Sequence, residues 1–412
     1  MRLLHTSDWH IGRSLYGQHR YKEYVSFLDW LAVTIEDQQV DALLVSGDIF
    51  DTTTPSNRAQ SLYYRFLSTI AASSCRHVII TAGNHDSPTF LDAPKDLLKG
   101  MHIHVIGTLP DDINQEVLVL HDKKGKAEAI ICAVPYLRDR DLRSVEAGES
   151  LEDKDAKLIH GIEQHYQIVA ERAKVLQAEI GKVPIIAMGH LFTAGGISVT
   201  GDGVRELYVG SLAHVGSNLF PELFDYVALG HLHVPQIVGK EDRIRYSGSP
   251  IPMGFGEAGT QKQVVLVDFF EKKAQGHPKI TTLSVPLFQD LKNISGTLEE
   301  ILHQLSYLIE QKRDIWVEIE YTGSRLAGEL QQSIEELVEG STLKVLRIRN
   351  MRIVDRVITL SEDDQTLDDI DPLDLFDRCL DVHQVTEDER PELIDAYKQI
   401  LQELEEHDEL AE

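Results

Sequence analysis

The 412-residue sequence predicts an α/β sandwich. Short runs of Val, Ile, Leu and Ala recur through its first two thirds, as buried strands require. Between the early runs lie apolar residues at helical spacing, on Tyr24, Leu28, Leu31 and Ile35 in the first such segment. Because strands and helices alternate, helices are expected to cover a layered sheet structure.

The predicted strands are bounded by small, polar or proline residues. They cover residues 2–7, 41–48, 77–86, 129–135, 184–190, 226–233, 244–250 and 264–269. A second helix is predicted from the apolar face formed by Ala59, Leu62, Phe66, Leu67 and Ile70.

Five of these strands end in a small residue followed by a side chain that can bind a metal. The pairs are Ser7 and Asp8, Gly47 and Asp48, Gly83 and Asn84, Gly189 and His190, and Gly230 and His231. Ligands of open α/β sheets gather outside the carboxyl ends of the strands, where small residues let the backbone turn closely. The five ends are therefore expected to converge on one site.

After residue 275 the composition changes. A β-α-β-α-β pattern over residues 279–350 lacks His/Asp ligand pairs and predicts a small two-layer domain. From Ser361 the chain is acidic and linker-like, and two helices are predicted after it. The second has an apolar stripe on Leu393, Ile394, Tyr397, Ile400, Leu401 and Leu404. The expected domains are 1–275, 276–350 and 351–412.

Composition limits the possible environments and partners. The formal net charge of −27 argues against unaided DNA binding, since free-standing nucleic-acid binders are more often basic. The three cysteines lack the close spacing of a disulfide framework or thiolate zinc site. No apolar run approaches the ~20 residues of a membrane helix, and no secretory leader is evident, so a cytoplasmic protein without a membrane partner is expected.

Seven side chains at or just after the strand ends are candidate metal ligands: Asp8, His10, Asp48, Asn84, His190, His231 and His233. Asp8 and His10 are two residues apart, so in extended backbone both would face the same side. Oxygen and nitrogen donors without sulfur suit Mn²⁺, Fe²⁺ or Zn²⁺. Seven ligands fit two metal ions, whose local positive charge would attract a phosphate despite the acidic chain.

Each candidate also has an ordinary structural interpretation when taken alone. A single histidine is more often a core or surface residue, and most of the 18 histidines are interpreted that way. Asp8 could cap a helix, Asn84 could be a turn residue, and Asp86 could cap the next segment. For Asp8 and Asn84, the ordered set of seven outweighs these interpretations. For Asp86, which lies outside this set, capping of the next segment and support of the site both stay open.

The segments "SDWH", "SGDIFD", "AGNHD", "MGH" and "LGHLH" together resemble the motif set of calcineurin-like metallophosphoesterases. The runs "HTSDWHIGR", "GDIFDTTTPS" and "YSGSPIPMGFGE", with the chain length, are similar to bacterial nuclease subunits that work with a coiled-coil ATPase. The resemblance implies a two-sheet β-sandwich flanked by helices, a small α+β capping domain over residues 276–350, and a C-terminal helical module over residues 351–412.

The resemblance also implies a role for each site residue. Four ligands would hold one metal ion: Asp8, His10, Asp48 and His233. The ligands of the second ion would be Asp48, Asn84, His190 and His231, with Asp48 shared. His85 would protonate or stabilise the leaving oxygen, and Asp51 resembles the acid that orients this catalytic histidine.

The function implied is Mn²⁺-dependent hydrolysis of DNA phosphodiesters at duplex ends and hairpins, using two Mn²⁺ ions, with Mg²⁺ and other divalent ions less favoured. A coiled-coil ATPase would dock on the C-terminal helices and supply ATP binding, since no G-x-x-x-x-G-K-[ST] loop is present. The family further implies a homodimer within a heterotetramer. The alternatives are a stand-alone metallophosphoesterase for nucleotides or phosphoproteins and a non-catalytic scaffold, against which the presence of His85 argues.

Overall fold

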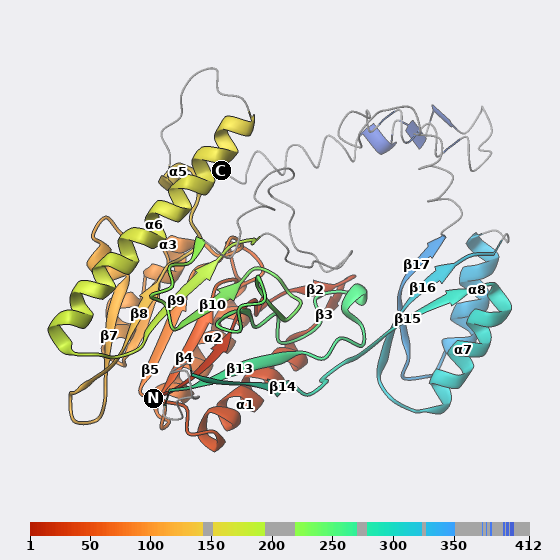
Figure 1. Cartoon of the computed structure of the whole chain (residues 1–412). Coiled ribbons are helices and arrows are strands. Elements are labelled where there is room, and N and C mark those ends of the chain that lie inside the picture. Colours follow the sequence, from red (N-terminus) through yellow and green to blue (C-terminus); the bar gives the residue numbers. More distant parts are fainter. Residues whose placement is uncertain are drawn as a thin grey trace. The chain divides into compact units, whose positions relative to one another are not determined.

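A computed structural model describes residues 1–142, 151–193, 219–269, 278–323 and 327–350, with isolated positions between 373 and 398. The chain divides into two compact units, residues 1–291 and residues 292–412. Each unit is described by itself (Figure 1). Among the described helices, none has the length and apolar character needed to cross a membrane.

The first sheet of unit 1 contains six strands in the order β14-β13-β1-β4-β5-β6. Strands β1, β4, β5 and β6 are parallel, whereas β13 is antiparallel to β1, and β14 is antiparallel to β13. The bounds are β1 Arg2–Thr6, β4 Ala42–Ser46, β5 His77–Thr81, β6 Ile103–Ile106, β13 Gln263–Asp268 and β14 Lys279–Ser284.

The second sheet also has six strands, in the order β11-β12-β10-β9-β8-β7. Strands β8, β9, β10 and β12 are parallel, and the two edge strands are antiparallel to their neighbours. The bounds are β7 Val117–His121, β8 Ala127–Ala133, β9 Ile185–His190, β10 Tyr226–Gly230, β11 Gln236–Ile237 and β12 Ile244–Tyr246.

The two sheets pack face to face because their strands present apolar side chains on both sides. In β1, Leu3 lies in the core between the sheets, with Ile131 and Met188 of the second sheet. Its neighbour Leu4 points to the opposite face and packs in the core beneath the helices. This alternation follows from the two-residue period of a strand. The predicted two-sheet sandwich is confirmed.

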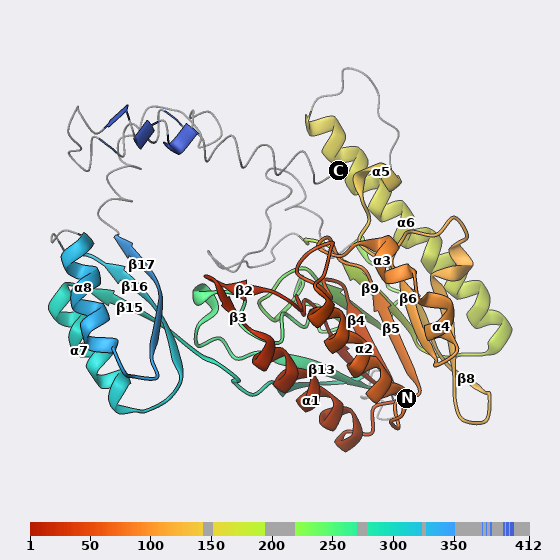
Figure 2. The ribbon, with the colours of Figure 1, turned by 180° about the vertical axis from the view of Figure 1, so that it is seen from behind.

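Helices cover both outer faces of the sandwich. The first sheet packs against α1 (Tyr21–Asp37) and α2 (Asn57–Ala71), and the second against α6 (Leu151–Ile180) (Figures 1 and 2). Ser56 caps the N-terminus of helix α2, and its hydroxyl accepts the backbone N–H of Ala59. The shorter elements are β2 Ser14–Leu15, β3 Gln18–His19, α3 Pro88–Asp92, α4 Lys95–Lys99, η1 Ile113–Gln115, α5 Asp139–Leu142 and η4 Phe255–Glu257.

Unit 2 contains a three-stranded sheet in the order β15-β16-β17. Alternate residues of β16, such as Val317 and Ile319, join apolar residues of the two helices in one core. The sheet therefore has both helices on the same face. The bounds are β15 Asp290–Gly296, α7 Leu298–Glu310, β16 Ile315–Tyr321, α8 Ala327–Val338 and β17 Lys344–Asn350.

The strand expected to open the small domain was wrongly assigned. Residues 279–284 form β14, which pairs antiparallel with β13 and completes the first sheet of unit 1. Strands that follow one another in the chain commonly pair, and this tendency outweighed the change in composition. The small sheet begins instead at β15. Its polar residues Lys292 and Asn293 interrupt the apolar pattern by which a strand is predicted.

The predicted C-terminal module lies almost entirely outside the described residues. This is true of the acidic linker from Ser361 and of Ile400, Leu401 and Leu404. Within the described part, the rings of Phe376 and Tyr397 stack with their centroids 4.1 Å apart.

Candidate metal centre

All seven candidate ligands lie together at the carboxyl ends of β1, β4, β5, β9 and β10. Three of the five strands belong to the first sheet and two to the second, so the site forms where the edges of both sheets meet. The backbone turns sharply there. Positive φ angles occur at Asp8 (53°), His10 (47°), Asp48 (51°) and His231 (105°), a conformation that such residues rarely adopt.

Small residues at the strand ends allow this convergence. A Cβ atom on Gly230 would lie 1.8 Å from the carbonyl oxygen of Ser46, which belongs to the opposite sheet. A Cβ on Gly83 would lie 2.1 Å from Oδ1 of Asp48. Glycine is therefore required sterically at both positions, as the small-residue pattern predicted.

The first group of ligand atoms comprises Asp8, His10 and His233, all buried and within 4.8 Å of one another. Nε2 of His10 lies 3.1 Å from Nε2 of His233. Burial is the main cause that lowers the pKa of His10 to about 4, so this ring is neutral at pH 7. Nitrogen lone pairs that face each other at this distance suit a shared cation.

The second group comprises Asp48, His190 and His231. Oδ1 of Asn84 lies 2.9 Å from Nε2 of His190 and 3.1 Å from Nδ1 of His231. Burial lowers the pKa of His231 to about 3. Burial also opposes the charging of His190, but the carboxylates of Asp48 and Asp8 outweigh it and raise the pKa to about 9. A divalent cation in this group would take the place of that proton.

Asp48 lies between the two groups. Its Oδ2 is 3.6 Å from Nε2 of His10 in the first group and 3.3 Å from Nε2 of His190 in the second. Its Oδ1 accepts the backbone N–H of His85 at 2.9 Å. Burial opposes ionisation, but His190 and His10 keep the pKa of Asp48 well below its usual value. A charged carboxylate thus faces both groups.

His85 lies beside the two groups, with its ring centroid 4.8 Å from that of His10. Its Nδ1 is 2.9 Å from the backbone carbonyl oxygen of Asp51, which fixes the ring and leaves Nε2 for another partner. The expectation that the acid of Asp51 orients His85 is wrong in this detail. The carboxylate lies instead 3.4 Å from Nδ1 of His10 and 3.2 Å from the guanidinium of Arg13.

Two further acids support the site. The carboxylate of Asp86 accepts the backbone N–H groups of Ile49, Phe50 and Gly83 at 2.9–3.1 Å, which joins the loops after β4 and β5. Sequence reasoning left this residue between capping and support. Glu257 is fully buried beside His233 and was not singled out. Its only sequence signal was its place at the end of the Gly/Pro-rich run "YSGSPIPMGFGE".

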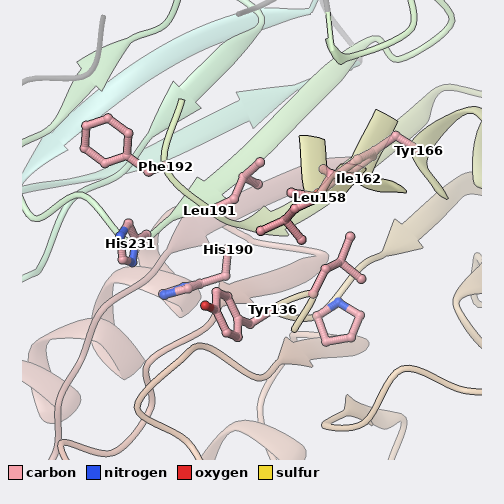
Figure 3. A pocket seen from close by; sticks show the side chains of 10 residues that line it. Tyr136, Leu158, Ile162, Tyr166, His190, Leu191, Phe192 and His231 are labelled. Atoms are coloured by element: carbon pink, nitrogen blue, oxygen red, sulfur yellow. The ribbon is translucent and has the colours of Figure 1, made fainter. Parts of the chain in front are cut away.

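An apolar pocket adjoins the second group (Figure 3). His190 and His231 line it together with residues that follow β8 and β9 and with Leu158, Ile162 and Tyr166 of α6. The ring of Tyr136 meets that of His190 edge to face at 6.2 Å. This apolar lining limits solvent access to one side of the two imidazoles, which strengthens their interaction with charge.

The donor set fits divalent metal ions. Nitrogen and oxygen atoms from buried side chains converge in two adjacent groups. Both groups contain imidazole nitrogens, whereas Mg²⁺ prefers sites made of oxygen ligands alone. The described cysteines do not contribute, since Cys75 and Cys132 lie in the hydrophobic cores beneath the helices.

Comparison with known proteins agrees with the fold. The family described as calcineurin-like phosphoesterase matches residues 1–235, the part of the chain that contains every candidate ligand. A second family, described as type 5 capsule protein repressor C-terminal domain, matches residues 287–384. Fold and site together thus define a calcineurin-like phosphoesterase that uses divalent metal ions.

Relatives that match most of the chain narrow the family assignment. The SbcD subunit of nuclease SbcCD from Escherichia coli K12 is 35% identical over 395 residues, covering 95% of this chain and 96% of the relative. The corresponding subunits from Rhodobacter capsulatus and Bacillus subtilis are 36% and 33% identical, covering 75% and 82% of this chain and 76% and 82% of the relatives. The chain belongs to the SbcD family of calcineurin-like phosphoesterases, as its motifs predicted.

Proposed function

We propose that this protein is the nuclease subunit of an SbcCD-type complex and hydrolyses DNA phosphodiesters with two Mn²⁺ ions. The position of Asp48 carries this proposal, because one carboxylate oxygen faces both groups of ligand atoms. The names of the relatives support a nuclease, and the family supports phosphoester hydrolysis. The imidazole-rich donor set favours Mn²⁺ over Mg²⁺.

The ligand sets follow the two groups. One ion would be held by Asp8, His10, Asp48 and His233, and the other by Asp48, Asn84, His190 and His231. When bound, two such ions supply a nucleophile from water and neutralise phosphate oxygens. Asp48 binds and spaces both positions, while Asp51 keeps a negative charge beside Nδ1 of His10 so that Nε2 faces the first position.

His85 completes the chemistry at the leaving oxygen. Its Nδ1–H donates to the carbonyl oxygen of Asp51, which aims Nε2 away from that contact. In its protonated form the ring delivers a proton from Nε2 to the departing alkoxide. The backbone N–H of His85 also donates to the carboxylate of Asp48. This bond fixes the position of the proton donor relative to the shared ligand.

A partner explains how an acidic chain acts on DNA. With a net charge of −27, the chain gains DNA affinity from an SbcC-like coiled-coil ATPase, which also provides the ATP dependence. We assign residues 292–350, the sheet and helices of unit 2, to a capping domain and residues 351–412 to ATPase docking. The assembly is a homodimer within a heterotetramer, acts in the cytoplasm, and cuts duplex ends as an exonuclease and hairpins as an endonuclease.

The test compares wild type with His85→Ala and the exposed control His121→Ala on a labelled hairpin duplex in Mn²⁺, with and without an SbcC-like partner and ATP. Wild type and His121→Ala should cut, chelation should abolish cutting, and His85→Ala should lose ~10²–10⁴-fold. Equal cutting by all three proteins, or cutting that survives chelation, contradicts the proposal. Hydrolysis of mononucleotides or phosphopeptides alone would establish a stand-alone phosphoesterase instead.

A further inference from the structure

A buried ion pair lies directly behind the candidate ligand His233. Glu257 ends the short helix η4 with 0% of its surface exposed, and Lys262, which precedes β13, is 4% exposed. Acidic and basic side chains are rarely buried to this extent unless they are paired. The ammonium group of Lys262 contacts Oε2 of Glu257, which also accepts the backbone N–H of Met253 at 3.1 Å.

Lys262 also hydrogen-bonds to the main chain of the candidate ligand His233. Its Nζ donates to the carbonyl oxygen of His233 at 3.0 Å and to the hydroxyl of Ser249 at 2.9 Å. Lys262 thereby fixes the backbone of His233 from a position about thirty residues later in the sequence. The ion pair therefore fixes the backbone of His233 and also places a carboxylate behind its ring.

The second carboxylate oxygen of Glu257 points at the ring. Oε1 has no hydrogen-bond partner among the described residues and lies 3.6 Å from Nδ1 of His233. A buried carboxylate oxygen without a partner is costly, and Nδ1–H of His233 is the donor in front of it. With its proton on Nδ1, the imidazole presents the lone pair of Nε2, the atom that faces His10 at 3.1 Å.

The same arrangement occurs on the other side of the ligand pair. The carboxylate of Asp51 lies 3.4 Å from Nδ1 of His10, as that of Glu257 lies 3.6 Å from Nδ1 of His233. Each imidazole thus has an acid behind Nδ1 and directs Nε2 toward the same position. An outer carboxylate of this kind fixes the tautomer of a metal-binding histidine and makes it a stronger ligand.

We propose that Glu257 is a positioning residue that accepts Nδ1–H of His233, is anchored by Lys262, and tightens the metal position formed by Asp8, His10 and His233. This inference rests on the proposed two-metal function and adds a residue to it. A purely structural ion pair would stabilise the fold without selecting between the two metal positions. The two interpretations differ in what they predict for metal affinity.

The chain offers a matched control. Glu23 is also a buried acid, paired with buried Arg20 at 2.7 Å, and Arg20 donates to the carbonyl oxygen of Pro252 in the same loop region. Neither residue contacts a candidate ligand in these bonds. Glu23→Gln therefore removes a comparable buried charge without touching the histidine.

The experiment counts bound Mn²⁺ by electron paramagnetic resonance of the free ion during titration of the full chain. Wild type and Glu23→Gln should bind two ions with the same affinities. Glu257→Gln should weaken one of the two ions by ~10–100-fold and leave the other unchanged. Thermal unfolding monitored by circular dichroism checks that each variant is folded.

Two outcomes overturn the inference: wild-type affinity for both ions in Glu257→Gln, or equal weakening in Glu257→Gln and Glu23→Gln. If Glu257→Gln does not fold, Glu257→Asp is titrated instead; it keeps the charge but withdraws it from Nδ1, so wild-type affinity there also contradicts the inference. Failure of the wild-type chain to bind two ions would instead reject the proposed two-metal function, so the two failures are distinguishable.

Discussion

The strand ends that carry the candidate ligands and the small sheet of unit 2 follow local conformational preferences to different degrees. At the strand ends, Asp8, His10, Asp48 and His231 have positive φ angles, which cost side-chain-bearing residues free energy. Two of these residues, Asp8 and Asp48, are buried acids. Burial raises the pKa of Asp8, and the nearby carboxylate of Asp48 raises it further. The arrangement places charge where a metal can bind at the expense of local stability.

In the helices of unit 2 the local signals agree with the fold. Helix α7 begins with a capping box in which the carboxylate of Glu300 accepts the backbone N–H of Thr297. Among residues 292–350 that the structure describes, Lys312 is the one non-glycine residue with positive φ. A region away from the metal centre can satisfy most local preferences, whereas a functional site violates several of them and is stabilised by its surroundings.

The largest expected effect comes from Asp48→Asn. Loss of the shared charge should lower the rate of Mn²⁺-dependent DNA cleavage by roughly 10³-fold or more, since metal ions contribute several kcal/mol to such reactions. The melting temperature without metal should fall, because the attraction between the Asp48 carboxylate and protonated His190 is lost, and this attraction outweighs the repulsion of Asp8. Cleavage assays and thermal melts measure both; a variant that keeps a tenth of the activity would show that Asp48 is not shared.

The next effect falls on unit 2. Leu305→Ala removes a fully buried side chain from the core of that unit and should cost about 2–5 kcal/mol of its stability. Hydrogen exchange should accelerate in β15, β16 and β17 but not in β1 or β4, and Mn²⁺ affinity should not change. Tyr307→Ala, at a 65% exposed position of the same helix, is the control with little effect. Equal acceleration in β1 would mean that the units unfold together.

The sequence predicted the site better than it predicted the contacts behind it. A small residue followed by a ligand marks a strand end, so Asp8, Asp48 and His190 could be placed from the residue pattern alone. The contact between His85 and Asp51 runs through a backbone carbonyl, which has no sequence signature. Glu257 reaches His233 only through tertiary folding, and no periodicity connects the two residues.

A smaller effect should appear on acidification, in the core between the two sheets. His5 is buried there, with Nδ1 2.9 Å from the hydroxyl of Tyr226 and Nε2 3.2 Å from the carbonyl oxygen of Leu229, and burial lowers its pKa from 6.5 to about 3. Below pH 6.5, His5 is therefore protonated in the unfolded chain but stays neutral in the folded chain. The stability from this group is complete above pH 6.5 and is lost progressively as the pH falls toward 3.

The measurement is urea unfolding of wild type and His5→Gln at pH 7 and pH 5. The stability advantage of wild type over the variant should shrink by about 2 kcal/mol between these values, from ~1.4 kcal/mol per pH unit. Other titrating groups cancel in this difference. Parallel pH profiles for the two proteins would mean that His5 is not held neutral in the core.

The smallest effect tests whether the two regions are independent. Thr297→Ala removes the N-cap hydroxyl of α7 and should lower the opening free energy of that helix by about 1 kcal/mol, whereas Thr297→Ser keeps the hydroxyl and should lose little. Hydrogen exchange of α7 amides gives this free energy, and Mn²⁺ titration of the same samples reports the metal centre. A change in metal affinity would show that the strained strand ends depend on the order of unit 2, because a lost cap has no other route to ligands that are all supplied by residues 8–233.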